Sequence, residues 1–219
     1  MTIRNVIATA YVFENGWNIG PVIDFDWVAV QEHGVNWRNP YVKFQMPNLL
    51  KLQTAAGEIT LTPDARLLAP LSNTAQGRGM LFGVASKQSL NWDIGKSPFS
   101  LNLTTYEQYN QFGTGPDGTF STGGTGELAG TGAYLNYYGV LSLNYQPAAW
   151  VGVWASYEMD GALTRAKAEL IDDGIFVDVG ATFNPIPEIS IMPFIDIKPK
   201  NPSFADGTSM NLWLTFSIL

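Results

Sequence analysis

His33 is the only histidine in the chain, so it is the first residue to consider as a catalytic base. Serine hydrolases place a histidine beside a nucleophilic serine, with an acidic residue behind it. Near His33 no serine or acidic partner stands out, and the Gly-x-Ser-x-Gly nucleophile motif is absent from the sequence. The sequence therefore favours the interpretation of His33 as a polar residue at the end of a strand, just before Gly34, over its interpretation as a catalytic base.

Asp24 and Asp26 are two residues apart, so on a strand their carboxyl groups point to the same side. Such a pair is a candidate for acid/base chemistry. Acidic side chains on a water-facing surface explain the pair more simply. We therefore expect no catalytic residue and no enzyme.

Residues 115–118, Gly-Pro-Asp-Gly, are a candidate calcium loop through backbone carbonyls and Asp117. The ligand count is too low and the EF-hand spacing is missing, so a turn is favoured. The chain has no cysteine, which excludes disulfides and thiolate metal sites. The sequence predicts no metal site and no cofactor.

The composition is rich in apolar residues and poor in charge. Hydrophobic residues make up 46% and charged residues 14%, whereas soluble domains carry roughly 25% charged residues. No stretch of about 18 apolar residues exists, which excludes a transmembrane helix. The net charge of −7 argues against nucleic acid as a partner.

Apolar and polar residues alternate along most of the chain. Between residues 58 and 71 the apolar parity holds Ile59, Leu61, Ala65 and Leu67, and the polar parity holds Glu58, Thr60, Asp64 and Arg66. Successive side chains of a strand point to opposite faces, so this pattern predicts a strand with one apolar and one polar face.

The same alternation predicts eleven strands, and their length is informative. A soluble strand usually has about 5–6 residues, but a membrane-crossing strand needs about 9–11, and most of these segments are at least that long. Pro47, Pro63 and Pro193 interrupt them, and we expect bulges or strand ends there. The predicted strands are 2–13, 21–32, 41–53, 58–71, 78–91, 98–111, 133–145, 149–159, 174–184, 188–198 and 208–219.

A twelfth strand is one of two interpretations of residues 162–171. Residues 162–171 alternate and follow Asp160-Gly161, a favourable hairpin turn, and bacterial barrels normally have an even strand number. The same residues also favour a helix. If the short turns at 146–148 and 184–188 lie at the same end, an even number of strands separates them. That arithmetic favours one long excursion over residues 160–173.

The strands, the proline-containing turns and the terminal segment from Met210 to Leu219 resemble bacterial outer-membrane β-barrels of the porin-like class. Residues 1–219 would then form one transmembrane antiparallel up-and-down barrel domain of about 12 strands, in contact with outer-membrane lipid. Residues 112–132, rich in Gly and Thr, would form a long loop at one mouth. Residues 1–20 do not have the pattern of a signal peptide. Aromatic residues near strand ends are similar to the interfacial girdles of that class: Trp27, Trp37, Trp92, Tyr109, Tyr145, Trp150, Tyr157 and Trp213.

Charged residues on the polar parity are the strongest indication of function. Both signs occur, as expected of a pore whose charges tune ion selectivity, or of a lumen plugged by ion pairs. The predicted pore-lining residues are Asp24, Asp26, Lys43, Lys51, Asp64, Arg66, Lys87, Glu158, Asp178, Asp196 and Lys198. The leading hypothesis is a narrow pore for passive diffusion of small solutes or ions, with the 112–132 loop as its constriction. The alternatives are a plugged barrel that anchors an outer-membrane assembly and a soluble β-sandwich binding module. A second copy or another membrane protein is a candidate partner.

Overall fold

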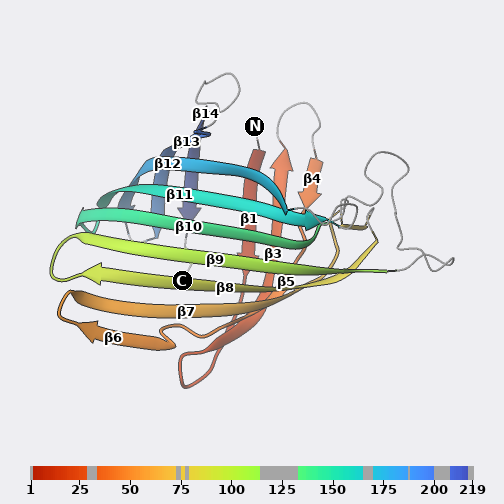
Figure 1. Cartoon of the computed structure of the whole chain (residues 1–219), viewed down its shortest axis with the longest axis horizontal. Helices are drawn as coiled ribbons and strands as arrows, with labels where there is room; N and C mark the ends of the chain where they lie inside the picture. The colour runs from red at the N-terminus through yellow and green to blue at the C-terminus, as the bar shows by residue number, and fades with distance from the viewer. Residues whose placement is uncertain are drawn as a thin grey trace.

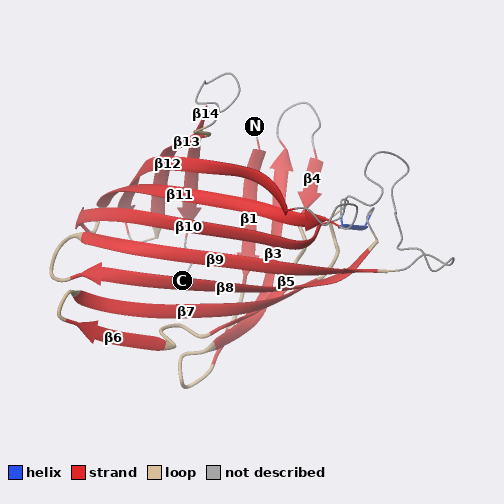
Figure 2. Cartoon of the chain, in the orientation of Figure 1, coloured by secondary structure: helices blue, strands red, loops and turns tan. Residues whose placement is uncertain are grey.

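The computed structural model describes residues 2–28, 34–72, 75–76, 79–113, 133–164, 170–186, 188–199 and 208–216. Strands dominate these residues and belong to one antiparallel sheet (Figures 1 and 2). The strands are β1 (Thr2–Ala8), β2 (Tyr11–Val12), β3 (Asn18–Val28), β4 (Gly34–Trp37), β5 (Tyr41–Gln45), β6 (Leu50–Thr54), β7 (Gly57–Leu68), β8 (Met80–Ile94), β9 (Phe99–Phe112), β10 (Ala133–Ala148), β11 (Val151–Thr164), β12 (Leu170–Ile186), β13 (Ile189–Ile197) and β14 (Thr208–Phe216).

The sheet runs up and down in chain order. Its main path is β1-β3-β5-β7-β8-β9-β10-β11-β12-β13-β14. The three short strands extend these positions: β2 pairs with β3 beyond the end of β1, while β4 pairs with β3 and β6 pairs with β7 on either side of β5. The eleven positions correspond to the eleven predicted segments, so the alternation identified every strand of the path. The third position begins earlier than predicted, at Gly34.

The prediction of a twelfth strand at residues 162–171 is wrong. Ala162 pairs with Ile171 and Leu163 with Leu170, so the segment holds the end of β11 and the start of β12. Asp160-Gly161 is no turn either, because both residues lie inside the ladder at a register shift. The alternation came from two strands meeting at one hairpin, which also removes the long excursion over 160–173. Residues 165–169, within the helical alternative, lie outside the described residues.

The connections support the parity argument about the two ends of the sheet. The β10–β11 connection and the β12–β13 connection are separated by β11 and β12, an even number of strands, and therefore lie at the same end. β9 ends and β10 begins at the other end. Residues 114–132, most of the predicted long loop, lie outside the described residues.

The strand prolines lie where the ladders are interrupted, as expected. Pro47 falls in the gap between β5 and β6, where Asn48 has a φ of 52°. Pro63 of β7 faces that gap, and its carbonyl accepts a hydrogen bond from the Met46 amide. Pro193 lies at a position that the β12–β13 pairing omits. The missing proline donors therefore fall where the partner strand does not require them.

The sheet is strongly curled. β8 to β12 run across the front in Figure 1, and β1, β3, β13 and β14 run behind them at a steep angle. The described ladders form an open path with β1 and β14 at its ends, so they do not close the sheet. Because the path has an odd number of positions, these two end strands point the same way. The fold that the structure supports is thus a curled, all-β, antiparallel up-and-down sheet.

The two faces of the sheet have inverted burial. Five polar side chains are buried on the enclosed face, which we name the polar face: Asp24, Asp64, Asn110, Ser156 and Asp178 are each 6–7% exposed. The opposite, apolar face is exposed, with Leu141 at 51%, Val179 at 50% and Leu212 at 59%. Buried hydrophobic residues among those described are few: Val22, Leu68, Ala75, Met80, Ala85 and Phe112. A soluble domain shows the reverse arrangement.

Candidate functional site

The pairings place ten of the eleven predicted pore-lining residues on the polar face, and the eleventh, Lys198, directly follows the end of β13. Residues paired directly across a ladder share a face, and the pairings connect the set from strand to strand, for example Lys43 to Arg66, Asp64 to Lys87, and Asp178 to Asp196.

A cavity of about 920 Å³ opens on this face. Asp24 and Asp26 of β3, Arg66 of β7, Lys87 of β8 and Trp213 of β14 all line it. Strands from both ends of the path therefore enclose one space. Sequence reasoning missed several other lining residues, although the polar parity of the strands predicts most of them: Asn36, Arg38, Asn39, Tyr41, Ser72, Thr104, Tyr106, Gln108 and Tyr138.

Trp213 does not belong to an aromatic girdle on the apolar face. It pairs with Met192 and lines the cavity, so it lies on the polar face. By contrast, Phe99 and Tyr145 stack on the apolar face near one end of the sheet, with ring centroids 4.7 Å apart. Phe25 and Trp37 pack together near the other end at 5.4 Å.

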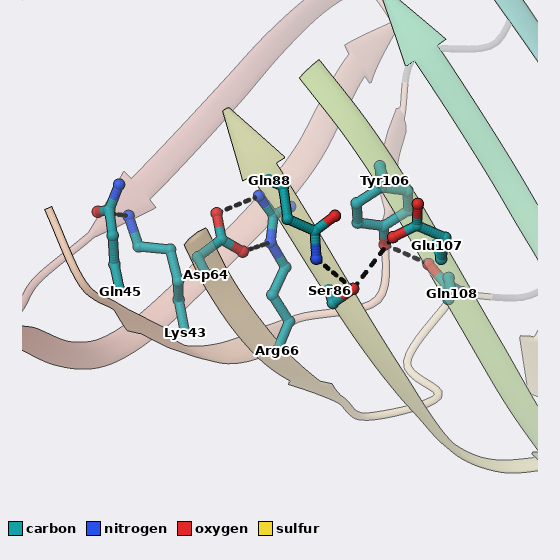
Figure 3. Close-up of polar contacts among 9 residues, drawn as sticks. All are labelled: Lys43, Gln45, Asp64, Arg66, Ser86, Gln88, Tyr106, Glu107 and Gln108. Atoms are coloured by element: carbon teal, nitrogen blue, oxygen red, sulfur yellow. Dashed lines mark hydrogen bonds and ion pairs between the residues drawn. The ribbon is translucent and has the colours of Figure 1, made fainter. Parts of the chain in front are cut away.

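A basic cluster follows β5, β7 and β8 and consists of Lys43, Arg66 and Lys87. The Arg66 guanidinium makes a two-point contact with Asp64, from Nε to Oδ1 at 2.6 Å and from Nη2 to Oδ2 at 3.0 Å (Figure 3). The rings of Tyr41 and Tyr106 flank it at 4.9 and 5.3 Å. Planar contacts of this kind hold an arginine in one orientation. Lys43 donates to Gln45 at 3.0 Å, and no salt bridge joins Lys43 or Lys87 to the other described side chains.

We expect Asp64→Asn to destabilise the protein by on the order of 3 kcal/mol, because Arg66 would lose its counter-charge in a largely buried setting. The side chains of Asp64 and Arg66 are only 7% and 17% exposed. Asp26→Asn is the matched control: its partner Arg38 is 48% exposed, so the loss should stay within about 1 kcal/mol. Urea unfolding of the two variants measures the difference, and equal losses would contradict it.

Asp24 and Asp26, the candidate acid/base pair, both lie beside the guanidinium of Arg38. Arg38 contacts Asp26 through Nη2 at 2.9 Å and through Nε at 3.1 Å, and it lies 3.8 Å from Asp24. Two carboxylates that share contacts with one guanidinium fit a structural ion-pair cluster better than proton transfer. Sequence analysis missed Arg38 because it falls between predicted strands.

An acidic cluster lies on β11, β12 and β13 and consists of Glu158, Asp178 and Asp196. Tyr138 donates to Glu158 at 2.8 Å, and Ser156 donates to Asp178 at 3.3 Å. Asp178 and Asp196 pair directly across the ladder, and one buried oxygen of each, Oδ1, has no hydrogen-bond partner among the described residues. Both of these oxygens are buried, so the cluster gathers three carboxyl groups on the polar face and leaves two of their oxygens without a described donor.

The remaining predicted charges lie toward the ends of the strands. Lys51 pairs with Glu58 at 2.8 Å at the short-turn end. The Lys198 ammonium lies 5.1 Å from the centre of the Phe176 ring, just past the end of β13. His33 and residues 115–118 lie outside the described residues.

Aromatic side chains fill part of the polar face beside the acidic cluster. Phe194 packs against Trp154 at 5.6 Å and against Trp213 at 5.0 Å between ring centroids. Gly180 makes room for them, because a Cβ there would lie 2.6 Å from the Trp154 ring and 2.7 Å from Phe194. This side of the enclosed space is therefore narrowed by rings.

In the described ranges, no group of three or more His, Cys, Asp or Glu residues has a metal-binding arrangement. No helix there is long and apolar enough to cross a membrane. No protein-family model matches the chain, and no curated protein matches it either.

Proposed function

We propose that the chain is a β-barrel of a bacterial outer membrane that forms a narrow pore for passive diffusion of small solutes or ions. The observation that carries this proposal is the inverted burial: polar residues such as Asp64 and Asp178 are buried, and apolar ones such as Leu141 and Leu212 are exposed. An apolar exterior of this extent is unfavourable in water. It suits lipid outside and water inside, which is the arrangement of membrane β-barrels.

The charge distribution supports a pore rather than a passive shell. The basic cluster centres on β7 and the acidic cluster on β12, five positions apart on an eleven-position path. In a closed tube they would face each other across the lumen, and opposite charges facing across a constriction act on passing ions. The acidic cluster places three carboxyl groups on neighbouring strands of the polar face, so we propose a preference for cations.

Single-channel recording in a planar bilayer tests this function. Purified, refolded protein should give reproducible conductance steps with a reversal potential that indicates cation preference. Protein denatured and added without refolding is the control for membrane leakage. Folded protein that inserts but stays silent would contradict the pore.

A plugged, structural barrel is the second candidate, and one observation favours it. Trp154, Phe194 and Trp213 fill part of the polar face, and the Tyr41 and Tyr106 rings fix Arg66 on the other side. Barrels of eight strands are filled by their own side chains, and those of 16–18 strands leave a channel. Eleven positions lie between these limits. A silent but inserted barrel would favour this scaffold function.

A further inference from the structure

Four polar side chains interrupt the apolar face of the sheet. They are Ser86 and Gln88 of β8 and Thr105 and Glu107 of β9, which we name the outer patch. Ser86 pairs directly with Glu107, and Gln88 with Thr105. On the next strand the same two pairs continue to Tyr137 and Gly139, so the patch lies on the face opposite to the cavity.

The outer patch is a connected hydrogen-bond chain. Thr105 donates to Gln88 Oε1 at 2.7 Å, Gln88 Nε2 donates to Ser86 Oγ at 3.0 Å, and Ser86 donates to Glu107 Oε2 at 3.1 Å (Figure 3 draws the last two). One N–H of Gln88 and the second oxygen of Glu107 make no further hydrogen bond with described residues. The patch therefore offers both a donor and an acceptor to a partner.

Glu107 is unusual for its location. Among strand residues whose side chains are described, it is the only Asp, Glu, Lys or Arg on the apolar face, and it is exposed. Phe99 and Tyr109 are aromatic residues on the apolar face of β9, ten residues apart. Ten residues of a tilted strand rise about 26 Å along the membrane normal, which is close to the height of the apolar band of a membrane barrel. Counting only the residues of the apolar face, Glu107 is the first residue from Tyr109 toward the middle of β9, and Thr105 is the second.

Exposure of the outer patch to lipid is energetically unfavourable. Acyl chains supply no hydrogen-bond donor or acceptor, so polar groups at that depth are costly unless protein satisfies them. Two of the four cross-strand neighbours of the patch are small: Ala65 lies beside Ser86 on β7 and Gly139 lies beside Thr105 on β10, whereas Pro63 and Tyr137 are the other two. Small residues around polar ones allow two membrane surfaces to approach closely and hydrogen-bond.

We propose that the outer patch is the contact between two copies of this chain in the membrane. A two-fold interface places a surface against itself, so it must supply its own donors and acceptors. The outer patch does this, because the free amide N–H of Gln88 and the free carboxylate oxygen of Glu107 can meet reciprocally. This inference rests on the membrane location in the proposed function, and it adds the partner.

Cross-linking in lipid vesicles tests the dimer, and the cysteine-free chain makes the reporter specific. Leu103→Cys places a thiol next to the patch on β9 and leaves its four side chains intact; Leu103 is 43% exposed. A short bismaleimide should give a covalent dimer. Val153→Cys on β11, 51% exposed on the same face, is the matched control and should remain monomeric. Adding Gln88→Leu and Glu107→Leu to the Leu103→Cys protein should reduce the dimer at least about five-fold, because the substituted surface is as lipid-compatible as its surroundings.

The outcomes separate the inference from the function on which it rests. Equal cross-linking of Leu103→Cys and Val153→Cys would overturn the dimer, as would a dimer that survives the double leucine substitution. Conductance is recorded on the same preparations. Protein that conducts but stays monomeric refutes only the dimer, and the outer patch would then be a contact for a different protein. Protein that never inserts into vesicles refutes the membrane location and the dimer together.

Discussion

Leu141→Arg should lower the free energy of unfolding in a lipid bilayer by about 2–4 kcal/mol, the cost of an arginine near the membrane midplane. Leu141 is 51% exposed on the apolar face of β10, midway between Tyr137 and Tyr145 of the same face. If this face contacts lipid, the guanidinium loses its hydration there. Urea unfolding of the protein in lipid vesicles, monitored by tryptophan fluorescence, measures the change.

Ser142→Arg is the matched control for that experiment. Ser142 is the next residue of β10, and it pairs with Ser156 on the polar face. An arginine there would lie near the acidic cluster, where its charge is favourable, so stability should change by less than about 1 kcal/mol. Equal losses in the two variants would show that the two faces do not differ in their surroundings, and the membrane proposal would fail.

Most of the strand order could be predicted because one physical rule governs it. A strand whose two faces meet two different environments must match each of them, so its residues alternate strictly. The alternation therefore identified all eleven positions of the path. It failed at residues 162–171, because a hairpin joins two strands of compatible parity and the pattern alone does not show where the chain reverses.

The prediction of the polar face succeeded for the same reason, and its gaps have physical causes. Parity placed Asp64, Arg66 and Asp178 on one face, but which charges meet depends on register, and register is set by pairing between distant segments. Arg38 lies in an interruption between β4 and β5, where parity gives no guidance. Ser86 and Gln88 break the parity of β8, and a parity rule treats such residues as exceptions rather than as a contact surface.

The alternation of residues does not determine whether the first and last strands pair to close the sheet into a barrel. An even number of strands would let the first and last strands pair antiparallel, and the sequence pattern suggested twelve. The described path has eleven positions, with β1 and β14 pointing the same way. Counting strands from alternation is accurate only when every reversal is located, and the reversal between β11 and β12 was misplaced.

Replacing the acidic cluster should reduce the cation preference of the pore. In the triple variant Glu158→Gln, Asp178→Asn, Asp196→Asn, the permeability ratio of K⁺ to Cl⁻ should fall by about three-fold or more, because fixed charges in a low-dielectric passage set the local concentration of counter-ions. Stability should not decrease, since Asp178 and Asp196 are like charges paired across a ladder. Reversal potentials in a salt gradient give the ratio.

Asp93→Asn is the control for this measurement. Asp93 lies on the same face near the short-turn end of β8, is exposed, and accepts a hydrogen bond from Asn91 at 2.9 Å. The Asp93→Asn protein loses one charge by the same carboxylate-to-amide change. Because that charge lies in open solvent, where salt screens it, the K⁺ to Cl⁻ permeability ratio should remain close to that of the unmodified protein. A triple variant that conducts with unchanged selectivity would mean that ions do not pass the acidic cluster. Arg66 and Lys87, together with Asp24, Asp26 and Arg38, would then be the charges that set selectivity, because they line the cavity on the polar face.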